Sequence, residues 1–347
     1  MKKILFYLSI MLIFTSCGSD NAQKEKTDTN KTEESAAQFP GLQAKAKAIF
    51  GQLPQLAENP NNPITKEKLT LGKKLYFDNR LSKDNTQSCN TCHNVATYGV
   101  DNSPLSKGNN GGFGTRNSPT TYNAALHSTQ FWDGREPDVE AQAGGPILNP
   151  AEMAMPSEKS VVKRLSGIEE YHTLFAAAFP DDKKPISFDN VKKAIGVYER
   201  TFITPSKFDD YLAGNNSALN QQEKEGLQTF INVGCVTCHS GNVLGGHLFQ
   251  KFGLMQNYWE LTNSKVIDNG KFDVTKNEAD KYVFKTPSLR NIEKTYPYFH
   301  DGSVQDLSEA TKIMAKLQLN KDLNDKELND LVTFMNTLTA DIPASIK

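Results

Sequence analysis

Two pentapeptides constrain this chain more than any other feature: Cys89-Asn90-Thr91-Cys92-His93 and Cys235-Val236-Thr237-Cys238-His239. In a C-x-x-C-H motif both thiols lie on one helical turn and can bond the haem vinyl groups, while the adjacent imidazole reaches the iron. Two copies predict two covalently bound c-type haems. The attachment residues are then Cys89, Cys92, Cys235 and Cys238, and the iron ligands are His93 and His239.

Zinc is the main alternative for paired C-x-x-C motifs. Zinc ribbons place their two pairs roughly 15 to 20 residues apart. Cys92 and Cys235 are separated by a far longer stretch, and each pair carries a histidine that zinc does not require there. Haem attachment is therefore the stronger interpretation.

The N-terminus has the form of an export signal. Residues 1–16 combine two lysines with an apolar run that is too short to span a membrane. Cys17 follows small residues, as in a bacterial lipobox, and predicts a lipid anchor on a polar, flexible tether over 17–38. The alternative is an ordinary signal peptide cleaved nearby. Both predict export, and we expect a periplasmic protein whose contact with a membrane is a lipid anchor.

The folded body is expected to begin near Phe39. Roughly 300 residues are too many for one small core and suit two domains. The formal net charge of −1 argues against nucleic acid as a partner.

The apolar pattern predicts a mainly α fold with long loops and few strands. Apolar residues recur at helical intervals over 65–77, 158–179, 189–202, 221–233 and 325–338. Thr65 and Asn220 are suited to cap the first and fourth of these helices. We expect two cytochrome c-like haem domains, 39–205 and 206–347, with packing of the last helix on the N-terminal domain left as an option.

Several further motifs give the chain a resemblance to the bacterial dihaem cytochrome c peroxidases from about Leu69 to Leu338. In addition to the two haem motifs they are Leu71-Gly72-Lys73-x-Leu75-Tyr76-Phe77-Asp78-x-Arg80-Leu81-Ser82, Arg116-Asn117-Ser118-Pro119-Thr120, Phe131-Trp132-Asp133-Gly134-Arg135, Gln142-Ala143-x-Gly145-Pro146, Glu152-Met153 and Pro297-Tyr298-Phe299-His300-Asp301-Gly302. The resemblance implies reduction of hydrogen peroxide to water with electrons from a small protein such as a monohaem cytochrome c. It leaves the oligomeric state open, with a homodimer as one option.

The resemblance also implies a division of labour between the haems. The N-terminal haem on His93 would be peroxidatic, and the C-terminal haem on His239 would take up electrons with Met314 as its second ligand. Glu152 would move the proton, Gln142 would orient peroxide, and Trp132 would lie between the haems. Without the resemblance, Met314 and Trp132 would be interpreted as core residues and Glu152 as a surface acid.

Three smaller expectations complete the site. Asn117 and the carbonyls of Thr295 and Pro297 match the family's calcium site. Many members carry a histidine where this chain has Asn109, and that histidine closes the peroxidatic iron until the other haem is reduced. Asn109 puts this activation step in doubt. His127, His172 and His247 are interpreted as surface or satisfied polar residues, and His300 as a residue near the C-terminal haem.

Two other functions stay open on the sequence. One is a dihaem oxidase of the methylamine-utilisation type, although a tyrosine stands there in the place of Met314. The other is a dihaem electron carrier without a substrate, which would have no use for Glu152 and Gln142.

Overall fold

Helices joined by long loops make up most of the chain in the computed structural model, which describes residues 39–344 and 346. The only named strands in that part are β1 (Phe249–Lys251) and β2 (Val283–Lys285), an antiparallel pair with Gln250 opposite Phe284. The mainly α prediction is confirmed. The α-helices are α2 (Leu42–Phe50), α3 (Lys66–Tyr76), α4 (Cys89–Cys92), α5 (Val139–Leu148), α6 (Glu158–Ser166), α7 (Glu169–Ala178), α8 (Phe188–Glu199), α9 (Lys207–Leu212), α10 (Gln221–Val233), α11 (Tyr258–Thr262), α12 (Phe272–Thr275), α13 (Leu307–Leu319) and α14 (Asp325–Asn336).

Helix starts follow the local sequence. The Thr65 side chain accepts a hydrogen bond from the Lys68 amide at the start of α3, and Asn220 forms a capping box with Glu223 at the start of α10. The single helix expected over 158–179 is instead two helices. α6 ends at Gly167, whose amide bonds back to the Arg164 carbonyl, and α7 begins after this break.

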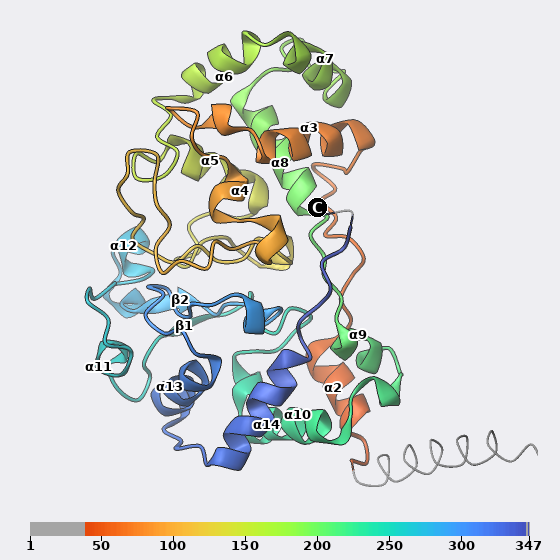
Figure 1. The fold of residues 1–347 in the computed structure, drawn as a ribbon, viewed down its shortest axis with the longest axis vertical. Helices are drawn as coiled ribbons and strands as arrows, with labels where there is room; N and C mark the ends of the chain where they lie inside the picture. Colours follow the sequence, from red (N-terminus) through yellow and green to blue (C-terminus); the bar gives the residue numbers. More distant parts are fainter. Residues whose placement is uncertain (1–38, 345, 347) are drawn as a thin grey trace, which may run out of the picture. The chain divides into compact units, whose positions relative to one another are not determined.

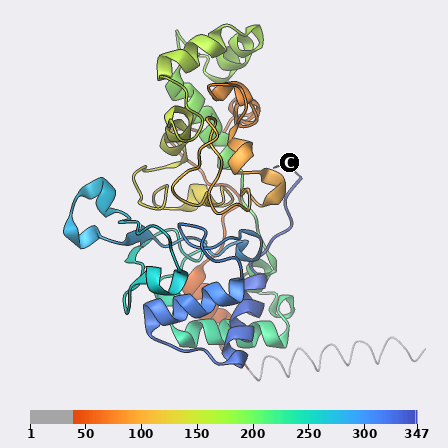
Figure 2. The ribbon, with the colours of Figure 1, turned by 60° about the vertical axis from the view of Figure 1, so that its left-hand side comes forward.

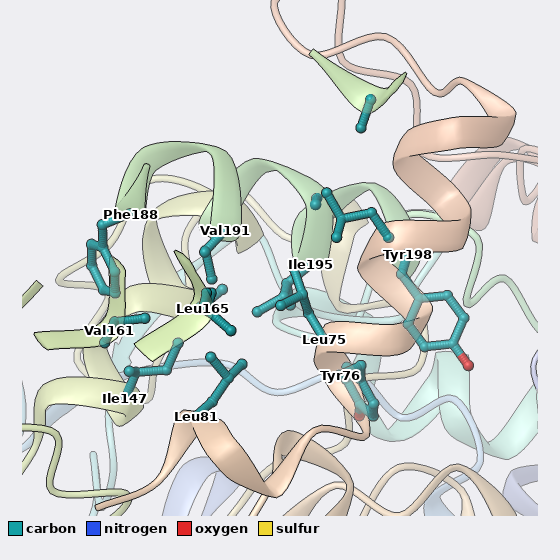
Figure 3. Close-up of a cluster of buried hydrophobic side chains, with 14 of the residues drawn as sticks. Leu75, Tyr76, Leu81, Ile147, Val161, Leu165, Phe188, Val191, Ile195 and Tyr198 are labelled. Carbon is teal, nitrogen blue, oxygen red and sulfur yellow. The ribbon is translucent and has the colours of Figure 1, made fainter. Parts of the chain in front are cut away.

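The first haem motif belongs to a core built on α3 and α8. Figure 3 shows Leu75 and Tyr76 of α3 beside Ile195 and Tyr198 of α8. Their side chains are buried, and α5 and α6 add Ile147, Val161 and Leu165 to the same cluster. A helix pair with this much buried apolar surface is rigid, and it supports the short helix α4 that carries Cys89.

The second haem motif lies in a group of helices around α10 and α14. Phe230 of α10 and Phe334 of α14 have ring centroids 5.1 Å apart, and Phe208 of α9 meets Phe334 at 5.2 Å. Phe50 of α2 joins them, 5.4 Å from Phe208. Figures 1 and 2 show α2 in this group although α3, the next helix along the chain, lies in the other.

The boundary between two haem domains at 205/206 stays a prediction. Segments near both ends of the chain pack on the other side of this boundary. α2 precedes the division in sequence but packs on α9, which follows it. After α14, the chain returns to the α3–α8 core, where the Tyr198 hydroxyl donates to the Ile346 carbonyl at 2.7 Å. α14 itself packs against α10. The residues from Gly41 to the C-terminus accordingly form one compact unit.

Close approach of the paired helices depends on glycines. A Cβ on Gly72 of α3 would lie 1.9 Å from the Ala194 carbonyl oxygen of α8, and one on Gly226 of α10 would lie 2.1 Å from the Asp330 carbonyl oxygen of α14. Such distances force the helices apart. A glycine at the helix contact therefore sets the spacing of the helix pair beside each haem motif.

We predict that Gly72→Ala lowers the free energy of unfolding by about 1–3 kcal/mol, since the added methyl overlaps backbone that cannot rotate away. Denaturant unfolding followed by helical circular dichroism measures this change. Gly145→Ala, at an exposed position of α5, is the matched control, because its Cβ would meet no atom closer than 3.4 Å. Equal stability of the two variants would contradict the prediction.

Candidate functional site

A cavity of about 290 Å³ opens beside the first haem motif. α4 begins with a capping box between Ser88 and Thr91, and the His93 amide closes the turn on the Cys89 carbonyl. Tyr76 of α3 donates its hydroxyl to the His93 carbonyl at 2.7 Å. The motif is thus fixed to the helical core. Cys89, Cys92, His93, Gln142, Glu152 and Trp132 all line this cavity.

Glu152 reaches the cavity on a turn that the sequence defines locally. Asp138 caps α5, which carries Gln142, and the helix ends at Asn149 ahead of Pro150. The Asn149 side chain accepts from the Ala151 amide and donates to Glu152 Oε1 at 2.8 Å. Burial raises the pKa of the Glu152 carboxyl, against smaller opposing effects of Asn149 and the Arg135 charge. A carboxyl held this way is suited to exchange protons.

A second cavity, of about 360 Å³, lies beside the second haem motif. Here the cysteine turn is a 3₁₀ turn, Cys235–Thr237, rather than the α turn of the first motif. Its lining is largely aromatic and aliphatic, with Phe252 and Phe284 among the buried residues. Cys235, Cys238, His239, Met314 and His300 all line it.

Trp132 lines both cavities. Its indole nitrogen donates to the Asn117 carbonyl at 2.9 Å, and its own carbonyl accepts from the Lys285 amide at 2.8 Å. The two bonds join segments far apart in the sequence. The walls of the two cavities share six residues: Trp132, Lys285, Pro287, Ile292, Tyr298 and Phe299.

Two arginines that line the first cavity, Arg116 and Arg135, are paired with carboxylates. Arg116 bonds Asp133 at 2.5 Å and Asp268 at 2.6 Å, and Arg135 bonds Asp133 at 2.8 Å while stacking on the Phe131 ring. The resemblance included Arg116, Asp133 and Arg135 only as motif letters, and Asp268 gave no signal because it comes from a distant segment. The network fixes the loop that carries Trp132.

Asn109 is held away from the cavity. Its amide nitrogen donates to Asp84 at 2.9 Å, and its oxygen accepts from the Asp84 amide and the Thr86 hydroxyl. Its backbone amide donates to the Glu152 carbonyl at 2.7 Å. The loop is therefore fixed on the turn that carries Glu152, with the side chain committed to other partners.

Sequence reasoning missed Glu199 and misjudged His127. Glu199 on α8 is only 4% exposed and lines the first cavity, where burial, reinforced by the Glu140 charge, raises its pKa to about 8. His127 was expected at the surface or satisfied, but its Nε2 is buried without a hydrogen-bond partner and its ring lines the first cavity. Apolar spacing on α8 could have indicated that Glu199 faces inward. Nothing in the local sequence indicates burial of His127.

The proposed calcium residues share the lining of one cavity. Asn117, Thr295 and Pro297 all line the first cavity, and the Asn117 amide nitrogen donates to the Ser103 carbonyl at 2.9 Å. Among the described residues, no cluster of three histidine, cysteine or acidic side chains could hold a metal ion. Cys17 and the expected signal and tether lie outside the described residues. In the described part, no helix is both long and apolar enough for a membrane span.

Both cavities fit a covalently bound haem. The thiols of Cys89, Cys92, Cys235 and Cys238 are free. His239 directs Nδ1 to the Leu244 carbonyl at 3.0 Å, which leaves Nε2 to bind iron. Burial lowers the pKa of the His93 and His239 rings and favours their neutral, ligating form.

Comparison with known proteins gives two family matches. Residues 66–217 match the family model described as di-haem cytochrome c peroxidase, and residues 223–339 match the cytochrome c model. The chain is 44% identical to cytochrome c551 peroxidase of Pseudomonas aeruginosa over 88% of this chain and 89% of that protein. It is 34% identical to methylamine utilization protein MauG of Methylorubrum extorquens, over 87% and 86% of the two chains. A solved MauG-like protein associated with microbial copper homeostasis has a TM-score of 0.74 at 28% identity, covering 86% of this chain and 95% of its own.

We predict that Glu199→Gln gains stability relative to the native protein as the pH rises. The raised pKa means that the folded state holds a proton between about pH 4.5 and 8 that the unfolded state releases, so native stability falls across this range. Glutamine cannot ionise. The difference in Tm between variant and native protein should therefore be larger at pH 8 than at pH 5. Exposed Glu169→Gln is the control, and a difference independent of pH would contradict the prediction.

Proposed function

Since this chain belongs to the di-haem cytochrome c peroxidase family and is a peroxidase of that class, we propose that it reduces hydrogen peroxide to water at the first cavity. One observation carries the proposal. Glu152 and Gln142 line the cavity of His93, whereas Met314 lines only that of His239. This asymmetry supports one open site and one closed site.

Two haem groups would be held by the residues already placed. Cys89, Cys92 and His93 would hold the first, and Cys235, Cys238, His239 and Met314 the second. When bound, the haems supply one-electron chemistry and, where a coordination position is open, a binding place for peroxide. Ligation by both His239 and Met314 would favour electron uptake by the second haem.

The protein side of the reaction is proton movement. In this proposal Glu152 would accept a proton from one oxygen of hydrogen peroxide and return it to the other, leaving oxygen. The Gln142 amide orients peroxide beside it. Asn149 keeps the Glu152 carboxyl in place through its 2.8 Å bond. Trp132, which lines both cavities, would shorten the path of the electron.

Our proposal extends to the setting of the enzyme. A small redox protein such as a monohaem cytochrome c would deliver electrons singly. Export to the periplasm rests on residues 1–16, and a lipid anchor rests on Cys17. Calcium at Asn117, Thr295 and Pro297 rests on their common place in one cavity wall. Steady-state peroxide consumption with a reduced small cytochrome c tests the activity directly.

A dihaem oxidase of the methylamine-utilisation type is the second candidate, because a MauG protein is also a relative. In that group a tyrosine is expected where this chain has Met314. A carrier without a substrate is a third. The presence of Glu152 and Gln142 in one cavity favours the peroxidase over both.

We predict that Glu152→Gln keeps both haems but lowers peroxide turnover about 100-fold or more, because an amide cannot exchange the proton. Haem content per chain and turnover with a reduced cytochrome are the measurements. Glu158→Gln, at an exposed position of α6, makes the same change outside the cavity and should keep native turnover. Native turnover in Glu152→Gln would reject the assignment.

We also predict that the fully oxidised protein reacts with peroxide without prior reduction. Asn109 offers no strong iron ligand and is bonded to Asp84 and Thr86. Electron paramagnetic resonance of the diferric protein should show a high-spin haem, and rapid mixing with peroxide should change its spectrum at once. Asn109→His is the matched variant, expected to slow this reaction if its ring reaches the iron. Two low-spin haems and no reaction before reduction of the native protein would show that another side chain closes the site.

A further inference from the structure

Lys285 is a buried cation at the wall that the two cavities share. It ends β2, is 6% exposed, and lines both cavities. Its backbone amide bonds the Trp132 carbonyl at 2.8 Å. Neither the expected chemistry nor any motif assigns it a role.

The Lys285 ammonium lacks an anionic partner within the described protein. Nζ donates to the Thr129 carbonyl at 2.9 Å and lies 3.3 Å from His127 Nδ1, and no carboxylate of residues 39–344 or 346 forms an ion pair with it. The other buried cation of this region, Arg116, is paired with Asp133 and Asp268. Lys285 is therefore the exception among these charges.

A buried, unpaired ammonium is strongly unfavourable, and burial lowers the pKa of Lys285 to about 8, with Asp133 opposing. An ammonium also has three hydrogens to donate, and two are directed at Thr129 and His127. The third donor and the missing countercharge both call for an anion. Since the side chain lines the cavities, that anion comes from a group bound within them.

The positions of the cysteines indicate which part of the bound group supplies this anion. Cys89 and Cys92 line only the first cavity, and Cys235 and Cys238 only the second. Thioether bonds hold the vinyl side of each haem at its cysteines, so the propionates lie at another edge of the ring. The shared wall, where Lys285 lies, is free of cysteines in both cavities.

We propose that Lys285 pairs with a haem propionate at this wall and thereby raises the reduction potential of that haem. A cation that neutralises a propionate makes addition of an electron more favourable. Lys285 is then a positioning and tuning residue for electron transfer, whatever substrate the open site accepts.

His127 favours the first haem as the owner of the propionate. If its Nδ1 accepts from Lys285, its Nε2 carries the hydrogen, and that buried atom has no partner. His127 lines the first cavity only. It is a second polar residue with an unmet hydrogen bond in the lining of that cavity.

The test compares Lys285→Gln with Lys285→Arg in the protein with both haems attached. Spectroelectrochemical titration resolves the two potentials, and haem content is checked for each variant. Lys285→Gln removes the charge and should lower the reduction potential of one haem. Lys285→Arg keeps the charge, so both reduction potentials should stay close to their native values. The haem whose potential falls owns the propionate, and a fall in both would mean that the lysine serves both.

Lys281→Gln is the control, since it removes an exposed charge near the start of the same strand. A shift in Lys285→Gln no larger than in this control would overturn the proposal, as would equal shifts in the Gln and Arg variants. If Lys285→Gln does not retain both haems, resonance Raman of Lys285→Arg decides. A changed propionate-bending band relative to native supports the ion pair, and an unchanged band rejects it.

Discussion

The two hydrogen bonds of Trp132 are the constraint on which the relation between the cavities depends. Its indole binds the Asn117 carbonyl, and its carbonyl binds the Lys285 amide. One residue thereby ties the loop at 117 to the strand at 285 and lines both cavities. Electron transfer depends steeply on separation, so a rigid shared wall matters more here than elsewhere in the chain.

The residues proposed to give the two cavities different chemistry lie on different local supports. Met314 lies on α13, a helix of 13 residues, which suits a permanent ligand. Glu152 lies on a turn after α5. Asn149 donates a hydrogen bond to its carboxylate, and the Asn109 amide donates to its backbone carbonyl. The same fold thus supports the proposed closed site and the proposed open one.

Charge at the shared wall follows a simple rule. Arg116 and Arg135 are compensated by Asp133 and Asp268 within the protein, so they fix structure. Lys285 has no such partner in the described residues, so its charge is available to a bound group. The paired arginines stabilise the loop, whereas the unpaired Lys285 ammonium is proposed to act on the bound haem.

The sequence by itself predicted the haem attachment residues, and it determined the helical class and several helix starts. C-x-x-C-H spacing and residues such as Thr65 and Asn220 act within one turn, so no distant contact is needed to interpret them. Only the tertiary structure brought His127 and Lys285 to the cavity walls, and only it moved α2 onto α9. Burial depends on which distant segments pack together, and no local pattern encodes that choice.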